Sequence, residues 1–292
     1  MIITEQTPVK ARRHRRTLSQ MDELLTGVLN ILGEYDDPIT IRHLFYRCSG
    51  AGLVQKTEDG YNQLRGHLVR WRRSKQVSMD AFIDGSRWHY GSFGSDDLSE
   101  YLLDCTRNYR RNLWQTQPYY VEVWVEKDAI ASLVNPIVSE WTLRMFPARG
   151  DASMSSLYQA SRLFKHYQQQ GRRSIIIYLG DYDESGIDIP NKIQSNLWED
   201  HDCYVEMRRV AINRNQIDEF NLPTRPPKGT KRGQAIDVAC EIDVLKPSDI
   251  RHLLNTEIEN LVNRDELMRM RAIEDAERET MSVMAANLGG AA

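Results

Sequence analysis

Hydrophobic residues in the first quarter of the chain recur every three or four positions, the spacing of one face of an α-helix. The pattern predicts three short helices, over residues 18–32, 40–47 and from 57 onward. The apolar face of the third helix is formed by Tyr61, Leu64, Leu68 and Trp71. The next segment, 77–88, contains a glycine, and we expect it to form a wing. Three helices followed by a wing are typical of a winged-helix DNA-binding domain.

From residue 119 onward the pattern changes to uninterrupted runs of β-branched and aromatic residues. Such runs predict strands buried on both faces, and their alternation with helical segments predicts a parallel sheet. We expect strands over 119–125, 143–146, 174–180 and 203–209, and helices over 128–140, 154–170, 188–198, 248–263 and 265–282. The predicted fold class is therefore α/β, with an N-terminal helical winged-helix domain ahead of a Rossmann-like parallel sheet.

The two patterns divide the chain into five expected units. These are a basic N-terminal arm (1–16), the winged-helix domain (17–95), a connector that includes a helix (96–117), the sheet domain with its late helices (118–284) and a tail (285–292). The 292 residues are 41% hydrophobic and 27% charged, which is ordinary for a soluble globular protein. Nothing in the composition indicates general disorder.

Cysteine spacing and hydropathy bear on the compartment. The four cysteines stand far apart without a Cys-x-x-Cys pair, so that neither a zinc site nor a disulfide framework is indicated and a reducing cytosol fits best. No apolar stretch approaches the roughly 20 residues of a membrane span, and no secretory signal is evident. We therefore expect a cytoplasmic, nucleoid-associated protein with no membrane partner.

A formal net charge of −3 hides an uneven distribution of charge. The third predicted helix carries a cationic cluster, with no acid between residues 61 and 75, formed by Arg65, Arg70, Arg72, Arg73 and Lys75. These side chains lie largely away from the apolar face, and a basic helix surface attracts the phosphates of DNA. The alternative is a helical domain whose arginines only solvate its surface.

Acidic residues stand directly after two of the predicted strands. Asp181 and Asp183 follow the run that ends at residue 180, and Glu126 follows the run that ends at residue 125. The carboxyl ends of parallel strands meet at one edge of the sheet, where open α/β sheets bind ligands. Carboxylates that repel each other there can share a divalent cation, and Mg²⁺ prefers oxygen ligands. The alternative is that these acids are helix caps and solvated turn residues.

Several other polar residues receive a structural interpretation. Asp188 is expected to cap the helix over 188–198 rather than to bind metal. Glu241 and Asp243 could join the acidic edge or simply end a strand, and we favour the second interpretation. His43 shares no metal-ligand spacing with the other histidines and is expected to lie on the surface or to pack against its neighbours.

Short motifs in this chain resemble those of one protein family. The segments VEVWVEKDA and YLGDYDESG look like a TOPRIM domain, the metal-binding module of topoisomerases, primases and some nucleases. The segment IRHLFYR is similar to the catalytic-tyrosine motif of the topoisomerase VI A subunit and of the related meiotic double-strand-break protein, and the segment EIDVLKP resembles a further family motif. In that family a winged-helix domain with the tyrosine precedes the TOPRIM domain. The resemblance covers residues 20–265 and is closest to the stand-alone mini-A proteins of phages and mobile elements.

The resemblance implies how the tyrosine would act. Tyr46 would attack a phosphodiester of duplex DNA and leave a 5′-phosphotyrosyl link. A phenol is a weak nucleophile at neutral pH, and Arg42 and Arg47 are the candidates to assist it. Arg42 lies four residues before Tyr46 on the same helix face, where it could stabilise the charge developing on the phosphate. The alternative is that Arg42 only contacts the DNA backbone or solvent. Arg47 would also contact DNA.

The resemblance also implies a metal centre. Glu126, Asp181 and Asp183 match the metal ligands of the family, with Mg²⁺ as the expected ion and Mn²⁺ as a substitute, and Glu126 would also be catalytic. Lys127 would either contact a phosphate or be a solvated surface lysine. Glu184 stands where relatives often carry proline, a departure that could alter the turn without removing a ligand.

The expected partners follow from the same resemblance. They are double-stranded DNA, a second copy of the chain whose metal site would work with the tyrosine of the first, and a separate ATPase subunit. The ATPase would be needed for strand passage because the chain has no Gly-rich ATP-binding motif. Two other functions stay open: a TOPRIM nuclease that uses metal-activated water, with Tyr46 structural, and a non-catalytic DNA-binding protein of a phage or mobile element.

Overall fold

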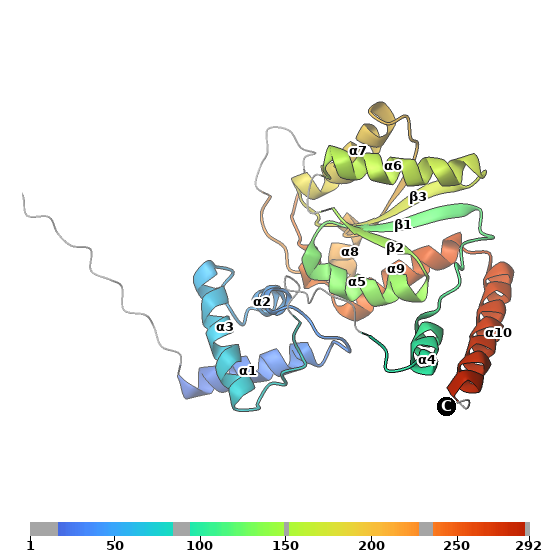
Figure 1. The fold of residues 1–292 in the computed structure, drawn as a ribbon. Coiled ribbons are helices and arrows are strands. Elements are labelled where there is room, and N and C mark those ends of the chain that lie inside the picture. Colours follow the sequence, from blue (N-terminus) through green and yellow to red (C-terminus); the bar gives the residue numbers. More distant parts are fainter. Residues whose placement is uncertain (1–16, 84–93, 149–151, 228–235, 290–292) are drawn as a thin grey trace, which may run out of the picture.

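The structure is a computed structural model that describes residues 17–83, 94–148, 152–227 and 236–289. Within these ranges the chain forms ten α-helices, one short 3-10 helix and four β-strands (Figure 1). In chain order they are α1 (Leu18–Leu32), α2 (Ile41–Gly50), α3 (Glu58–Arg73), α4 (Leu98–Asn108), β1 (Tyr119–Val125), α5 (Asp128–Glu140), β2 (Arg144–Pro147), α6 (Met154–Gln169), β3 (Arg173–Leu179), α7 (Glu184–Glu199), β4 (Glu206–Ala211), α8 (Arg214–Glu219), η1 (Ile242–Val244), α9 (Pro247–Leu261) and α10 (Arg264–Gly289).

The four strands form one parallel sheet in the order β2-β1-β3-β4. From β1 the chain crosses to β2 on one side, whereas from β3 it crosses to β4 on the other side. Helix α5 covers one face of the sheet together with α9, and α6 and α7 cover the opposite face (Figure 1). The strand order therefore reverses between β1 and β3, and such switch points are where open α/β sheets bind ligands. The α/β fold class predicted from the sequence is confirmed.

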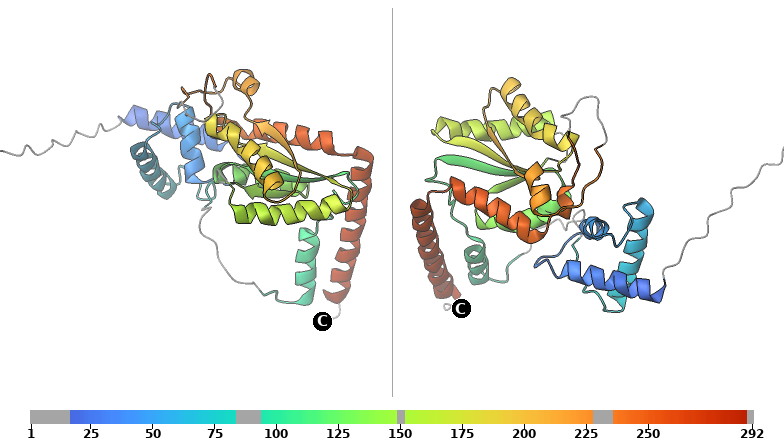
Figure 2. Two further views of the ribbon diagram at one scale, coloured as in Figure 1. Left: turned by 90° about the horizontal axis from the view of Figure 1, so that it is seen from above. Right: turned by 180° about the vertical axis from the view of Figure 1, so that it is seen from behind.

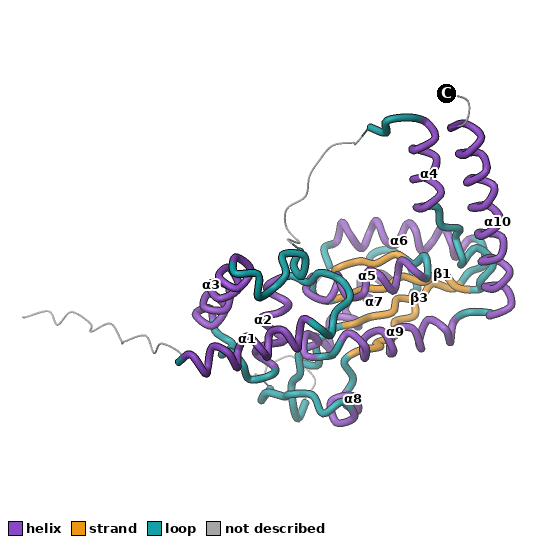
Figure 3. Tube along the Cα trace, turned by 90° about the horizontal axis from the view of Figure 1, so that it is seen from below, coloured by secondary structure: helices purple, strands orange, loops and turns teal. Residues whose placement is uncertain are grey.

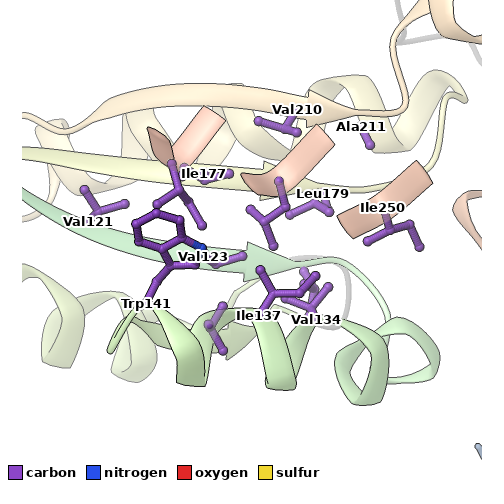
Figure 4. Close-up of a cluster of buried hydrophobic side chains, with 14 of the residues drawn as sticks. Val121, Val123, Val134, Ile137, Trp141, Ile177, Leu179, Val210, Ala211 and Ile250 are labelled. Atoms are coloured by element: carbon purple, nitrogen blue, oxygen red, sulfur yellow. The ribbon is translucent and has the colours of Figure 1, made fainter. Parts of the chain in front are cut away.

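The apolar runs of the strands are buried on both faces, as their pattern predicts. Alternate residues of β1, β3 and β4 pack against α5 and α9, including Val123, Leu179 and Val210 (Figure 4). The intervening residues, such as Trp124 and Tyr178, pack against α6 and α7. Because both faces are covered, the polar groups that follow the strands are confined to the ends of the sheet.

Helices α1, α2 and α3 have an apolar core of their own. It contains the predicted seam residues Leu64, Leu68 and Trp71 together with Val28 and Leu44. This three-helix group lies beside the carboxyl-end side of the sheet domain, with α2 against η1 and α5 (Figure 3). The first helices of the chain are thus placed next to the ends of β1 and β3.

Helices α4 and α10 lie side by side, away from the three-helix group (Figure 2). The hydroxyl of Tyr109, just after α4, donates a 2.6 Å hydrogen bond to Glu277, and the Ser99 hydroxyl donates one of 2.9 Å to the Ala285 carbonyl. Helix α10 continues to Gly289, whereas the sequence predicted a tail from residue 285 onward. None of the helices in the described ranges is long and apolar enough to cross a membrane.

The predicted bounds of a few elements differ from the structure, and in one case a side-chain cap explains the difference. Asp183 caps α7 by accepting hydrogen bonds from the backbone N–H groups of Ser185 and Gly186, so that the helix begins at Glu184. The prediction that Asp188 caps this helix is therefore wrong, because Asp188 lies within its first turns. Helix α8 was not predicted, and β4 begins at residue 206 instead of 203.

Part of the predicted wing lies in the described residues. There, Phe82 forms an isolated bridge with Ile39, and the Ile39 backbone N–H donates to the Ala81 carbonyl at 3.1 Å. The rest of the segment 77–88, the basic arm 1–16 and the end of the predicted tail lie outside the described residues.

Candidate functional site

Glu126 lies at the switch point of the sheet. Its backbone N–H donates a 2.9 Å hydrogen bond to the Leu179 carbonyl, which continues the pairing of β1 with β3 beyond the strand ends. Its side-chain Oε2 accepts the backbone N–H of Asp181 at 2.9 Å and faces the Tyr178 hydroxyl at 3.5 Å. The Glu126 carboxylate, at the end of β1, thus lies on the turn that follows β3.

Two glycines permit this close approach. A Cβ atom at residue 180 would lie 2.5 Å from Oε2 of Glu126, and one at residue 186 would lie 2.3 Å from the Asp181 carbonyl oxygen. Both distances are shorter than a nonbonded carbon–oxygen contact allows. At residue 186 the clash is with backbone, so Gly186 is required for the turn between β3 and α7, whereas a side chain at residue 180 would force the Glu126 carboxylate to shift. Arg209 secures the same turn, since its guanidinium donates hydrogen bonds to the Gly180, Asp181 and Gly186 carbonyls.

The environment of Glu126 favours its protonated form. Burial raises the pKa of this carboxyl to about 7, and the negative charge of Asp181 adds to the effect, while the hydrogen bond from the Asp181 N–H opposes it. A carboxyl that titrates near neutral pH is suited to accept and return a proton.

Asp181 is buried, and both of its oxygens have partners. Oδ1 accepts the backbone N–H of Ile242 at 2.9 Å, and Oδ2 forms a 2.9 Å ion pair with the Nζ of Lys127. Burial raises the pKa of Asp181, although the ion pair with Lys127 opposes the shift. The segment around η1 is thereby joined to the end of β3.

Lys127 links three carboxylates. Besides Asp181, its Nζ lies 2.8 Å from Asp243 and 3.5 Å from Glu241. Burial alone would lower the pKa of Lys127, but Asp181 and Asp243 outweigh it and raise the pKa, so that the ammonium stays charged. Glu241 and Asp243 therefore belong to the acidic edge, and the favoured prediction that they simply end a strand is wrong.

Asp183 has a different set of partners. One oxygen caps α7 through the backbone N–H groups of Ser185 and Gly186, at 3.1 and 2.8 Å. The other forms a 3.0 Å ion pair with Arg225, a residue that the sequence analysis did not single out. This carboxylate combines the capping role of the alternative interpretation with a place at the acidic edge.

Tyr46 lies on α2 among three cationic side chains. The Nε of Arg42 donates a 3.2 Å hydrogen bond to its hydroxyl. The Nζ atoms of Lys56 and Lys127 lie 5.5 and 5.8 Å from the centre of its ring. Lys56 also forms an ion pair with Glu241. The tyrosine therefore lies beside the acidic edge of its own chain, whereas the resemblance implies that it works with the site of a partner.

A buried polar pair underlies this contact between the helices and the sheet. His43 is fully buried, and its Nε2 pairs with the Tyr35 hydroxyl at 2.9 Å. Its Nδ1 lies 3.9 Å from Oδ1 of the buried Asp243, and neither of these two atoms has a hydrogen-bond partner. Burial lowers the pKa of His43 to about 4, so that the ring is neutral at pH 7. His43 therefore packs against its neighbours, which is one of the two placements expected from the sequence.

The arginines and lysine expected to contact DNA from α2 and α3 differ in exposure. Arg65, Arg70, Arg73 and Lys75 are exposed on and just after α3. Arg47, in contrast, is only 10% exposed, donates to the Val244 carbonyl at 2.7 Å and pairs with Glu34. It therefore connects α2 with α1 and η1, and its expected contact with a phosphate is not compatible with this geometry.

Arg72 is neither fully exposed nor part of the contact that Arg47 makes. Its guanidinium lies 5.2 Å from the centre of the Phe82 ring and donates a 3.3 Å hydrogen bond to the Met79 carbonyl. The side chain is half-buried and supports the segment that follows α3.

The expected metal ligands lie at one edge but are not arranged around an ion. In the described ranges no group of three or more acidic, histidine or cysteine side chains is placed to hold a metal. The oxygen donors are of the kind that Mg²⁺ binds. However, the ammonium of Lys127 occupies the space between Asp181 and Asp243, and Arg225 holds Asp183. In this arrangement the residues do not fit the ion.

Sequence reasoning missed Lys56, Arg209 and Arg225 because their partners lie far away along the chain. Asp243 carried a signal in the segment EIDVLKP, whose likeness to a family motif was noted. Comparison of the chain with protein-family models, curated proteins and solved structures finds no match. The functional argument therefore rests on the short motifs and on the geometry of the site.

Proposed function

We propose that this protein is a DNA-cleaving transesterase in which Tyr46 attacks a phosphodiester. The observation that carries the proposal is the place of Tyr46, whose hydroxyl accepts a hydrogen bond from Arg42 while its ring adjoins Lys127 at the acidic edge. A core tyrosine has no need of three cations around it. A nucleophile that approaches a negatively charged phosphate does.

The proposed reaction forms one bond and breaks one. The Tyr46 oxygen attacks phosphorus and loses its proton, the bond between phosphorus and the 3′ oxygen breaks, and the 3′ oxygen takes up a proton. The products are a 5′-phosphotyrosyl link and a free 3′-hydroxyl. Arg42 and Lys56 would neutralise the phosphate charge, and Glu126, whose pKa is raised to about 7, suits the transfer of the proton.

DNA would lie across the three-helix group, which we propose to act as a winged-helix domain ahead of a TOPRIM sheet. The exposed cations of α3 support this orientation, since they form a basic surface on the same three-helix group as Tyr46 and attract phosphates. Mg²⁺, or Mn²⁺ in its place, stays an expectation of the resemblance alone, because Lys127 and Arg225 hold its expected ligands in this structure. The proposal also includes a second copy of the chain. A separate ATPase would be needed for strand passage.

The test is a cleavage assay on end-labelled supercoiled and linear duplex DNA in Mg²⁺ or Mn²⁺, stopped with detergent and analysed with and without protease. We expect breaks whose 5′ ends carry protein until proteolysis. Tyr46→Phe should abolish them and Tyr61→Phe should not, because Tyr61 lies near the same arginine without a hydrogen bond to it. An intact adduct in the Tyr46→Phe protein would refute the proposal.

The raised pKa of Glu126 also favours a second function, hydrolysis by an activated water in a TOPRIM-type nuclease. Free 5′-phosphate ends that persist in Tyr46→Phe and vanish in Glu126→Gln would identify this reaction. Binding without cleavage in every variant would identify a DNA-binding protein of the third expected class.

A further inference from the structure

A second cationic region lies in the segment 141–180, which the sequence analysis did not single out. The segment contains one acid, Asp151, and six cations, which are Arg144, Arg149, Arg162, Lys165, Arg172 and Arg173. Arg149 and Asp151 lie outside the described residues. This excess of positive charge stands in a chain whose formal net charge is −3, and it gives the region a positive potential.

The topology brings two of these arginines to the amino end of the sheet. Arg173 is the first residue of β3, and Arg172 directly precedes it. Parallel strands start at the same end of a sheet, whereas Tyr46 and the acidic edge lie where β1 and β3 finish. Because β1 has seven residues, the two ends are separated by roughly 23 Å. A contact at the amino end is therefore separate from the site of the proposed reaction.

Both arginines lie against tyrosine rings. The Arg173 guanidinium lies 4.8 Å from the centre of the Tyr119 ring and donates a 2.6 Å hydrogen bond to its hydroxyl. The Arg172 guanidinium lies 4.7 Å from the centre of the Tyr167 ring, which is stacked on Tyr120 with the ring centres 4.0 Å apart. Stacking on a ring holds a guanidinium in place without neutralising its charge.

Arg144 joins this group from the edge strand β2. It pairs in register with Glu122 of β1, and its charge acts on the Tyr120 hydroxyl, whose pKa is raised by burial and by Glu122. Glu122 is buried and accepts a 2.6 Å hydrogen bond from that hydroxyl. Among the described residues, none of Arg144, Arg172 and Arg173 forms an ion pair with an acid. The three positive charges therefore stay uncompensated.

The arginines keep most of their hydrogen-bonding capacity. A guanidinium has five N–H donors, and Arg172 and Arg173 use theirs only on the carbonyl and the hydroxyl of Tyr119. Arg144 and Arg173 are exposed. Fixed guanidinium groups match the oxygens of phosphates, and several of them on one surface suit a chain of phosphates. Duplex DNA presents such a chain at regular spacing.

We propose that Arg144, Arg172 and Arg173 form a second DNA-binding surface, which holds the phosphates of a duplex other than the one at Tyr46. The exposed cations of α3 would hold the first duplex, so that one protein would bring two duplex segments together. This inference goes beyond the proposed reaction, because it does not require Tyr46 to react.

The first experiment measures whether the protein captures a labelled short duplex on beads that carry an unlabelled one. Arg144→Gln combined with Arg173→Gln should weaken this capture by about tenfold to a hundredfold, because two phosphate contacts are lost. Binding of a single duplex, measured by fluorescence anisotropy at low DNA concentration, should change by less than about twofold, since the cations of α3 remain.

The matched control is Arg264→Gln combined with Arg269→Gln. It removes the same charge from two exposed arginines that are paired with Glu259 and Glu266, and it should keep the wild-type capture. Tyr46→Phe should also capture the second duplex, so that a failure of cleavage and a failure of this surface can be told apart. No capture by the wild-type protein, undiminished capture in the Arg144 and Arg173 variant, or an equal loss in the control would overturn the proposal.

A second measurement uses the wild-type protein and does not depend on whether a variant folds. An arginine-specific reagent modifies the protein with and without saturating duplex, and mass spectrometry follows Arg144 and Arg173, with Arg264 as the internal reference. We expect DNA to slow the modification of Arg144 and Arg173 at least about fivefold, as phosphate contacts would, and to leave Arg264 unchanged. Equal modification rates with and without DNA would show that no duplex lies on this surface.

Discussion

Two sets of cationic side chains in this molecule have different surroundings, although each side chain carries the same single positive charge. Arg65, Arg73 and Lys75 on and after α3 are exposed, and in the described part of the chain they form no ion pair with an acid. Lys127 and Lys56, near the sheet edge, are paired with carboxylates that come from distant segments. The first set forms a basic surface that is open to solvent. The second set forms ion pairs that connect segments distant along the chain.

The difference shows that the number of charges does not decide what a cation does. An exposed arginine is screened by salt and contributes to binding through its phosphate contact alone. A half-buried lysine between two buried aspartates holds separate elements together and adjusts the chemistry of its neighbours. Substitutions in the two sets should therefore have effects that differ in kind and size.

The largest expected effect tests whether Tyr46 works with the acidic edge of its own chain or with that of a second copy. Tyr46→Phe and Asp181→Asn should each lower DNA cleavage by at least about a thousandfold, as expected for the loss of a nucleophile or of a group that supports it. Because Tyr46 lies beside the edge of its own chain, co-expressing the two variants with different tags should not restore cleavage. A mixed dimer would contain one undamaged site if the tyrosine worked with its partner. Recovered nicking in the purified mixed dimer would thus contradict the arrangement within one chain.

The next effect is the pH dependence of stability that the buried His43 should cause. His43 has a folded-state pKa of about 4 against an ordinary value near 6.5, so the unfolded state binds its proton first. Stability is therefore complete above pH 6.5 and is lost as the pH falls toward 4, by up to about 3 kcal/mol. Urea unfolding at several pH values should show a smaller loss in His43→Phe than in the wild-type protein.

A smaller effect is expected at the tyrosine. Arg42→Ala should lower the rate of adduct formation by about tenfold to a hundredfold at saturating DNA, because it removes the donor to the Tyr46 hydroxyl. Arg42→Lys should recover part of the rate. A change in DNA affinity alone, with an unchanged rate at saturation, would show that Arg42 only binds DNA, as the exposed cations of α3 are expected to do.

The smallest effect is expected on α3. Arg65→Ala and Arg73→Ala should each weaken DNA binding by about threefold to tenfold at moderate salt and lower the slope of log affinity against log salt by about one unit. The adduct rate at saturating DNA should stay the same. Fluorescence anisotropy at several salt concentrations measures this, and an unchanged slope would show that the cations of α3 do not touch phosphates.

Much of the fold could be predicted because it depends on local patterns. The strand over 119–125 and the helices over 18–32 and 128–140 have the predicted bounds. Consecutive β-branched residues such as Ile175, Ile176 and Ile177 can only be covered from both sides of a sheet. The start of α7 was misplaced because two acids, Asp183 and Asp188, could each serve as a cap.

The sequence alone determined the α/β class, the acids at the ends of β1 and β3, and the basic face of α3, since each of these is set by residues close together along the chain. Only the tertiary structure decided which groups meet. It placed Tyr46 beside its own acidic edge, brought Asp243 to Lys127 across more than a hundred residues, and buried Arg47. The physical reason is that ion pairs between distant segments depend on how the helices dock on the sheet, and no local spacing encodes that docking.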